Sequence, residues 1–216
     1  MREFHRAAAA AALLAFAGAA QATASDARFY GLESFTVVYE SAGMQTGTKT
    51  IHARENGKVR AEISDLQIKM GGMTIPPKKL RTVTNGAEIV TIDLATNTGT
   101  RMTNPLYDRM AAGMEGKSGL DVGMDFMKAL GGSQTGETRT IAGAACSVWT
   151  IPSLMQEHCI TDDGITLFTS SNLAGMNMSE TAVEYRPGDG GPDEAFSLDG
   201  ITITDFTMPN LPRRQQ

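Results

Sequence analysis

The residues of this chain best suited to chemistry are its two cysteines, Cys146 and Cys159. They lie in sequence typical of β-strands, and Pro152 stands between them. A pair of this kind can form a disulfide, bind a metal ion or provide a catalytic thiolate. The compartment that the N-terminus indicates and the other chemistry-bearing residues of the chain distinguish these three alternatives.

The first 24 residues have the three parts of a secretory signal peptide. Arg2 and Arg6 form a basic start, residues 7–20 are an apolar run rich in alanine, and Ala22-Thr23-Ala24 has the small side chains of a cleavage site. The run is shorter than the roughly 20 apolar residues that a membrane span needs. We therefore expect cleavage after Ala24 and a soluble periplasmic protein without stable membrane insertion. An alanine-rich helix of a cytoplasmic domain is the alternative.

An oxidising compartment favours a disulfide between Cys146 and Cys159. If Pro152 and Ser153 are the central residues of a tight hairpin, the two cysteines lie directly opposite each other, as a disulfide requires. A metal site needs more ligands, and beyond the leader the chain has only two histidines, His52 and His158. A catalytic thiol needs a base, but the side chains of His158 and Cys159 point to opposite faces of a strand. The sequence therefore predicts a structural disulfide.

Methionine is unusually frequent, with 13 residues. Several stand close together, as Met70 with Met73, Met124 with Met127, and Met176 with Met178. Thioethers are soft ligands that select Cu(I), so these pairs allow a copper site. Methionine also packs irregular cores and suits surfaces that accept varied apolar shapes. We favour packing or cavity lining over copper, and the sequence predicts no cofactor.

Composition and motif searches argue against several classes of protein. The formal net charge is −5 and there is no basic run, so nucleic acid is not an expected partner. The sequence has no nucleophile elbow, no zinc-protease motif and no phosphate-binding glycine loop. The acidic stretch 188–196 has neither the spacing nor the repetition of a calcium-binding loop. We therefore expect a protein that is not an enzyme.

Most of the chain is predicted to be β-structure. Residues 34–41 alternate, and Asn56-Gly57 separates two extended runs in the strongest hairpin signal of the sequence. In that register His52 lies opposite Ala61 on the apolar face. A second Asn-Gly, at 85–86, predicts another hairpin.

Residues 105–130 break the β pattern and predict two short amphipathic helices. Asn104 resembles an N-cap followed by a proline at the first helical position, and Gly131-Gly132 ends the region. Apolar residues recur at helical spacing, and we expect them to face the concave side of the sheet as a ligand-lining lid: Leu106, Met110, Met114, Leu120, Met124 and Met127.

This layout resembles the LolA/LolB fold, shared by RseB and LppX. The likeness lies in the signal peptide, the strand order and the helical insertion. "GKVRAEI", "IAGAACSVWTI" and "HCITDDGITL" also resemble a related family of uncharacterised periplasmic domains with a two-cysteine hairpin. The resemblance implies an α+β domain over residues 25–206, followed by a flexible tail at 207–216. Its curved, incompletely closed antiparallel sheet would form a half-barrel with a mid-chain helical insert.

The expected function is non-enzymatic binding of a hydrophobic ligand, either a lipid or the acyl chains of a lipoprotein. The lipid-bearing cysteine of LolB-like members is missing, and no ligand-contacting residue of LolA can be placed on this chain. Two alternatives remain open: an envelope sensing or interaction module without a small ligand, and a Cu(I)-binding protein that uses the methionine pairs.

Overall fold

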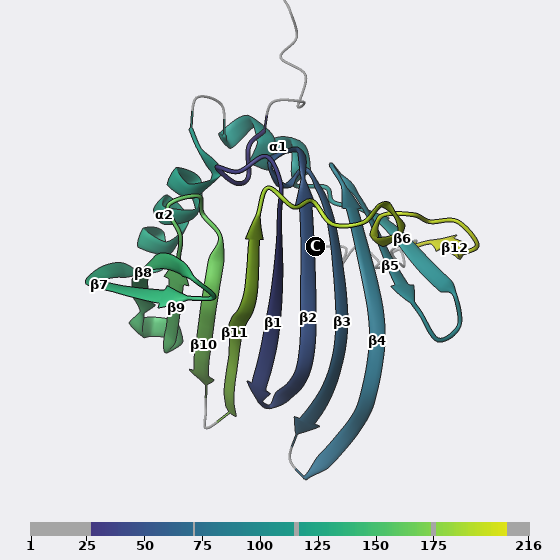
Figure 1. Cartoon of the computed structure of the whole chain (residues 1–216), viewed down its shortest axis with the longest axis horizontal. Helices are drawn as coiled ribbons and strands as arrows, with labels where there is room; N and C mark the ends of the chain where they lie inside the picture. Colours follow the sequence, from purple (N-terminus) through teal and green to yellow (C-terminus); the bar gives the residue numbers. More distant parts are fainter. Residues whose placement is uncertain (1–26, 71, 115–116, 174–175, 207–216) are drawn as a thin grey trace, which may run out of the picture.

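A computed structural model describes residues 27–70, 72–114, 117–173 and 176–206. The predicted signal peptide and the predicted C-terminal tail lie outside these residues. The described part forms one sheet of twelve strands and, between the sixth and seventh strands, two α-helices (Figure 1). The elements are β1 (Phe35–Gly43), β2 (Gln45–Arg54), β3 (Val59–Met70), β4 (Met73–Asn85), β5 (Glu88–Asp93), β6 (Thr98–Thr103), α1 (Tyr107–Gly113), α2 (Gly119–Ala129), β7 (Ser133–Ile141), β8 (Ala144–Ile151), β9 (Gln156–Ile160), β10 (Thr166–Leu173), β11 (Met176–Pro187) and β12 (Thr202–Asp205).

The strand order is β12-β6-β5-β4-β3-β2-β1-β11-β10-β9-β8-β7. Two runs of hairpins, β1 to β6 and β7 to β11, are therefore joined side by side through the pairing of β1 with β11. The two helices lie between these two runs along the chain, as predicted, and the sheet does not close on itself. One expectation was wrong, because β12 runs parallel to β6. The chain after β11 crosses several strands before it reaches β6. A connection of this length lets β12 run parallel to its neighbour, whereas a tight hairpin joins only antiparallel strands.

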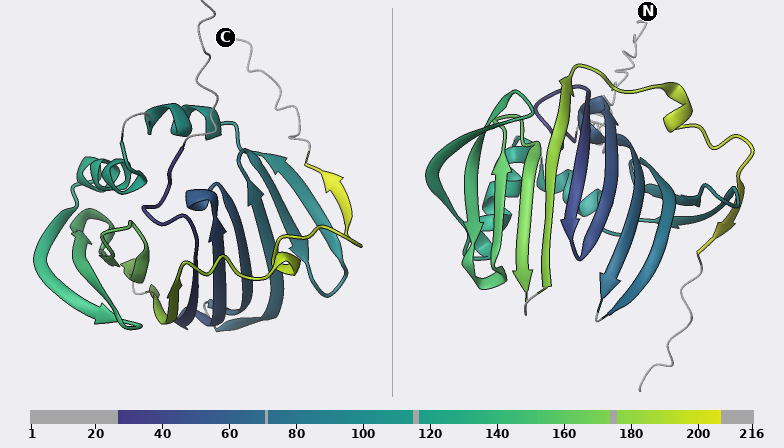
Figure 2. Two further views of the ribbon diagram at one scale, coloured as in Figure 1. Left: turned by 45° about the horizontal axis from the view of Figure 1, so that its top comes forward. Right: turned by 60° about the horizontal axis from the view of Figure 1, so that its bottom comes forward.

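The sheet curls toward the face that carries the helices (Figure 2). The strand register shifts at Val38/Tyr39, Leu66/Ile68, Gln134/Thr138 and Thr166/Phe168. Such bulges bend a strand and increase its local twist, which curves a sheet. We call the side that carries the helices the concave face.

The hairpin predicted at Asn56-Gly57 is confirmed in its register, because His52 pairs with Ala61. Asn56 and Gly57 both have positive φ, the conformation for which the Asn-Gly signal selects. The second hairpin is also confirmed, with Asn85 paired to Glu88 across the turn.

Both predicted helices are present, although each is shorter than the range suggested. Asn104 caps the turn before α1, since its side-chain oxygen accepts from the Leu106 N–H at 3.0 Å. Ser118 and Asp121 form a capping box at the start of α2. After α2, Gly131 has a φ of +81° and the Gly132 N–H donates to Met127 O, so the two glycines end the helix as predicted.

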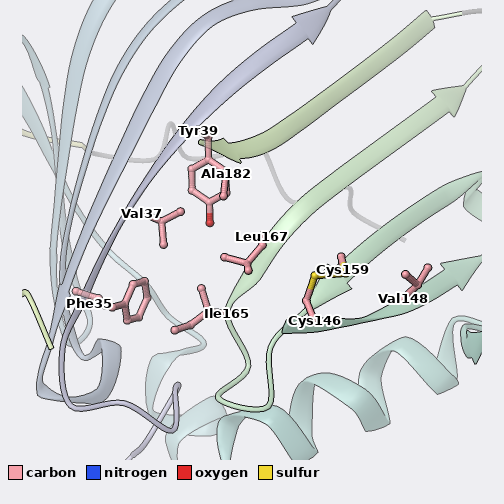
Figure 3. Packing of buried hydrophobic residues seen from close by; sticks show 10 residues of the cluster. Phe35, Val37, Tyr39, Cys146, Val148, Cys159, Ile165, Leu167 and Ala182 are labelled. Atoms are coloured by element: carbon pink, nitrogen blue, oxygen red, sulfur yellow. A yellow bond between two sulfur atoms is a disulfide. The ribbon is translucent and has the colours of Figure 1, made fainter. Parts of the chain in front are cut away.

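The main core joins the two halves of the sheet. It contains Phe35, Val37 and Tyr39 of β1 and extends through β10 and β11 to the cysteines of β8 and β9 (Figure 3). A second apolar cluster fixes α2 on Trp149, Ile151 and Ile160. Strand β8 is therefore buried on both faces, because Cys146 and Val148 belong to the main core while Trp149 and Ile151 contact the helix.

The segment 188–201, which we call the strap, leads from β11 to β12 on the face opposite the helices (Figure 2). Leu198 and Ile201 pack against Val83, Val90 and Ile92 of the sheet. Two arginines hold the strap by its carbonyl groups. Arg54 Nε donates to Gly190 O at 3.0 Å, and Arg81 Nη2 donates to Ser197 O at 2.7 Å.

Candidate functional site

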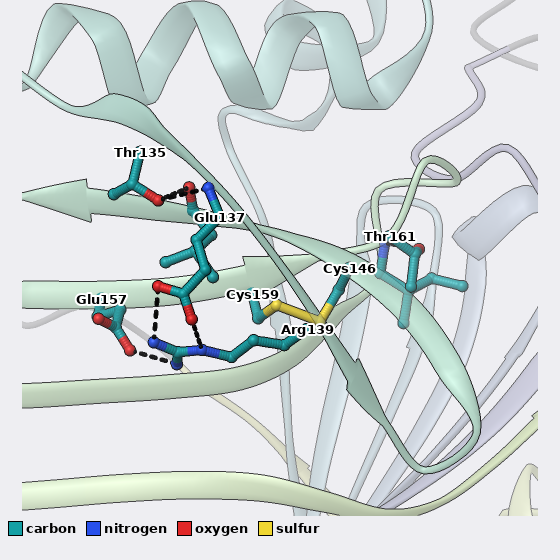
Figure 4. Close-up of a disulfide and its surroundings, with 9 residues drawn as sticks. Thr135, Glu137, Arg139, Cys146, Glu157, Cys159 and Thr161 are labelled. Carbon is teal, nitrogen blue, oxygen red and sulfur yellow. Dashed lines mark hydrogen bonds and ion pairs between the residues drawn. A yellow bond between two sulfur atoms is a disulfide. The ribbon is translucent and has the colours of Figure 1, made fainter.

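The predicted disulfide between Cys146 and Cys159 is present, with 5.3 Å between the two Cα atoms (Figure 4). The register that supported the prediction was wrong. Cys159 pairs with Val148, so the cysteines are offset by two positions. The reason is the turn, in which Pro152–Leu154 form a 3-10 helix and Met155 adds a left-handed residue.

The six apolar residues of the helical insert divide into two groups. Leu106 and Met110 are 55% and 43% exposed, so the structure does not turn them toward the sheet. Met114, the third predicted residue of this half, is buried, and it packs with Tyr107 and Ala111. The buried side of α1 therefore begins at Tyr107, one position after the predicted Leu106. Tyr107, Ala111 and Met114 also recur at the spacing of one helix face, and this face buries an aromatic side chain.

The second half of the stripe packs as predicted on the side that faces the sheet. Met127 is buried against Trp149, and Leu120 and Met124 pack in the same cluster. Neither α1 nor α2 contributes to the lining of the hollow described next. The role of the six residues as ligand-lining groups therefore stays a prediction.

The concave face has a hollow of about 290 Å³ at the junction of the two halves of the sheet, which we call the central hollow. Strands β1, β2, β9, β10 and β11 and the segments before β1 and β10 form it. Its lining combines aromatic and aliphatic groups with charged and polar ones: Tyr30, Phe35, Tyr39, Lys49, Ile51, His158, Gly164, Ile165, Thr166, Thr169 and Glu180. No periodic signal in the sequence indicates this set, because its members meet only through the pairing of β1 with β11.

An ion pair lies inside the central hollow. Lys49 donates to Glu180, and the two side chains are only 16% and 14% exposed. Lys49 Nζ also lies 5.0 Å from the centroid of the Tyr39 ring, within the range of a cation–π contact. Ser41 Oγ is 3.4 Å from the other carboxylate oxygen of Glu180. The hollow thus holds one charge of each sign among apolar walls.

Two further groups in the hollow are held neutral. Burial raises the pKa of Tyr39 far above its usual value, and nearby Glu180 adds to this effect. The Tyr39 hydroxyl donates to Thr166 O at 2.7 Å. Burial also lowers the pKa of His158, so its imidazole is uncharged at neutral pH.

A second hollow of about 510 Å³, the outer groove, lies over β4, β5, β6 and β12. Its apolar walls include Leu80, Met102 and Phe206, and hydroxyl groups of several threonines form its floor. Lys78 and Asp93 face each other there at 2.9 Å, with the lysine side chain 61% exposed.

The methionine pairs differ in their surroundings. Met124 and Met127 pack around Trp149, which fits the packing interpretation. Met73 and Met176 are 61% and 43% exposed, and the side chain of Met70 lies outside the described part. The residues described include no cluster of three or more histidine, cysteine and carboxylate side chains arranged to hold a metal ion.

His52 is buried beneath the strap, on the face opposite the central hollow. Its Nδ1 lies 2.8 Å from Thr36 Oγ1, which donates its own hydrogen to Asp189 O. Because a hydroxyl has one hydrogen, Nδ1 must carry the hydrogen of the His52–Thr36 bond. Gly191 lies directly over the ring, and a Cβ there would stand 2.2 Å from Nδ1. His52 is therefore a structural group of the strap.

No family model matches the chain. No curated protein matches it either. Among solved structures it is similar to an uncharacterised conserved protein from Thermus thermophilus, with 10% identity and a TM-score of 0.51 over 82% of this chain and 93% of that one. The likeness to the Thermus protein is one of fold. The chain is also similar to MucB, with 12% identity and a TM-score of 0.42 over 81% of this chain and 59% of MucB.

Within the described residues, no helix is long and apolar enough to cross a membrane. The disulfide fits a protein that folds outside the cytoplasm, where thiols are oxidised.

Proposed function

We propose that this chain is an exported, non-enzymatic binding protein that holds a hydrophobic ligand on the concave face of its sheet. The ligand class is a lipid or the acyl chains of a lipoprotein. The observation that carries the proposal is the central hollow, which brings Tyr30, Phe35, Ile51 and Ile165 together around a concavity at the middle of the sheet. Sites for small apolar ligands are typically concave and mostly apolar, with a few placed polar groups.

The size of the hollow suggests how such a ligand is accommodated. About 290 Å³ is at the small end of the range of about 300–1,000 Å³ seen for ligand sites. A long acyl chain therefore needs more room than the hollow offers in this conformation. Movement of α2 away from β8 and β9 would provide it, with Leu120 and Met124 then lining the enlarged site.

The driving force is the removal of methylene groups from water, at about 0.8 kcal/mol for each buried CH₂. An opened α2 would leave Met127 and Trp149 exposed, so the gain from ligand burial must offset that loss. Methionine suits this exchange, because its flexible side chain packs equally well against a protein core or an acyl chain.

A second candidate is an envelope interaction module without a small ligand. Leu106, Met110 and Phe126 on the two helices are 55%, 43% and 64% exposed, and exposed apolar side chains are typical of protein contact surfaces. In this alternative the helices bind a partner protein and the central hollow has no occupant.

Native mass spectrometry of protein purified from its own periplasm tests the proposal most directly. We expect bound lipid masses, whereas a bare chain supports the interaction module and bound copper supports the methionine hypothesis.

Binding of a fluorescent fatty acid to lipid-stripped protein then locates the site. Ile51→Trp fills the central hollow, and we expect it to weaken binding by at least about tenfold, since a bulky group there competes for the ligand's volume. Ile75→Trp is the matched control, because Ile75 is 43% exposed on β4 and does not line the hollow. Absence of binding to the wild type would refute the lipid proposal.

A further inference from the structure

The central hollow contains a charged pair that the burial of apolar chains does not require. Lys49 comes from β2 and Glu180 from β11, so the pair bridges the two halves of the sheet across β1. Both side chains are more than four-fifths buried, yet both line the hollow. They are therefore shielded from bulk water but remain in reach of a bound molecule.

Such a pair contributes little to the stability of a fold. Removing two charges from water costs free energy that their mutual attraction only partly returns, and apolar replacements of similar size are often neutral or stabilising. The neighbours add only a cation–π contact from Tyr39 and a long hydrogen bond from Ser41. Stability therefore does not explain why two side chains in the wall of the hollow carry charges.

We infer that Lys49 and Glu180 bind the headgroup of the ligand, and that the ligand is a zwitterionic amphiphile. This inference rests on the proposed function, and it adds the chemical class of the ligand. The anionic group of the headgroup binds Lys49 and its cationic group binds Glu180. The two protein charges exchange one partner for another, and neither is left unpaired in a buried site.

The two other classes of headgroup fit less well. An anionic headgroup pairs with Lys49 but lies beside Glu180, whose charge repels it. An uncharged headgroup must compete with an ion pair that is already formed, and it brings no opposite charge to replace the partner that each side chain would give up. His158 is neutral in the hollow and leaves its net charge at zero, which matches a ligand with equal and opposite charges.

The apolar walls place the chain of such a ligand. Ile51 stands two positions from Lys49 on the same face of β2, and Tyr30 packs edge-on against Phe35 with ring centroids 4.8 Å apart. A headgroup at Lys49 and Glu180 therefore places the first methylene groups against aromatic and aliphatic side chains.

Calorimetric titration of lipid-stripped protein with three amphiphiles of one acyl chain tests the inference. The probes are lysophosphatidylethanolamine (zwitterionic), lysophosphatidylglycerol (anionic) and a monoacylglycerol (uncharged), each below its micelle concentration. We expect the wild type to bind the zwitterion at least about tenfold more tightly than either of the others, as one net charge-assisted contact predicts.

Lys49→Met/Glu180→Met should remove this preference to within about twofold while monoacylglycerol binding persists, since only the headgroup contacts are lost. Lys49→Glu/Glu180→Lys retains one charge of each sign and should keep the preference, which serves as a test if the methionine variant fails to fold. Arg101→Met/Glu88→Met removes a more exposed pair of 3.3 Å between β6 and β5, away from the central hollow, and is the matched control.

The outcomes distinguish the headgroup inference from the proposed function. Equal binding of all three probes by the wild type, tightest binding of the anionic probe, or a preference that survives in the methionine variant would overturn the headgroup inference alone. Failure of the wild type to bind any probe would overturn the proposed function, and the inference with it.

Discussion

Cys146 and Cys159 lie in the main core beside Leu167 and Val148, where neither is accessible to water beyond 2% of its surface. Arg139 covers the hairpin nearby, because it donates to Glu137 and Glu157 at 2.7 Å each and joins β7 to β9 (Figure 4). Single residues thus fix the edge of the sheet that carries α2.

Loss of the disulfide should lower the stability of the whole protein, while the hairpin of β8 and β9 still forms in the folded state. We expect Cys146→Ala/Cys159→Ala to lower the free energy of unfolding by about 2–4 kcal/mol, the usual effect of removing such a crosslink. Urea denaturation measures the change. In parallel, thiol titration of the denatured, unreduced wild type should find no free thiol, and two thiols for each chain would contradict the bond.

Mild acid should weaken the protein through His52. Its pKa is lowered from 6.5, first by burial and then by the charges of Arg186 and Arg54, while Asp189 partly opposes the shift. The unfolded chain therefore binds the proton more readily, and stability falls as pH drops below 6.5.

Urea midpoints at pH 7.5 and pH 5.5 measure this loss of stability; these two values bracket the histidine range and lie above the carboxylate range, at about 4. His52→Asn keeps a hydrogen-bond donor toward Thr36 and should flatten the pH dependence. His158→Asn corrects for the second histidine. An unchanged pH dependence in the His52→Asn protein would contradict the assignment.

Among the elements, α2 is the one whose movement the proposed binding requires. It is held by one apolar side, a capping box at Ser118 and a glycine C-terminus, while its far side exposes Phe126. A helix attached by so few large side chains can leave the sheet at modest cost, which a lid requires. The strap differs, because arginine contacts to its carbonyl groups and an apolar cluster fix it along its length.

Neighbouring residues of α2 should respond very differently to truncation. Met127→Ala should cost about 2–4 kcal/mol, because Met127 is buried against Trp149 and its loss leaves a cavity. Phe126→Ala should change stability by less than about 0.5 kcal/mol, because Phe126 lies in solvent. Melting temperatures compare the two, and similar losses would show that α2 does not dock as the structure has it.

The whole molecule is a sheet whose two hairpin runs share one core. Phe35 and Val37 from the first run and Leu167 and Cys159 from the second belong to one apolar cluster. Neither run can expose its part of this cluster without exposing the other. The central hollow lies at the same junction, so the proposed binding surface exists only when both runs are assembled.

Unfolding should therefore be a single cooperative transition. Trp149 is the only tryptophan of the chain and reports on the contact of β8 with α2, whereas far-ultraviolet circular dichroism reports on the whole sheet. We expect both signals to change at one urea concentration. Loss of the Trp149 signal at a clearly lower concentration would show that the β7–β9 edge and α2 unfold separately.

Local patterns in the sequence determined much of the secondary structure. The Asn-Gly dipeptides specify two hairpins and the register that pairs His52 with Ala61, because only a few residues adopt positive φ at low cost. Asn104 and Gly131 likewise mark the ends of the helical insert through bonds to residues next to them in the chain. The disulfide was predicted from the expected signal peptide and the number of cysteines.

Only the tertiary structure decided how these elements meet. The 3-10 turn at Pro152 shifted the cysteine register, and the choice of Tyr107 over Leu106 as the buried residue depended on what α1 packs against. The pairing of β1 with β11 joined Lys49 to Glu180, residues more than a hundred positions apart. Local propensity acts over a few neighbouring residues, whereas strand pairing between distant segments depends on the packing of the whole core. For that reason the central hollow could not be read from the sequence.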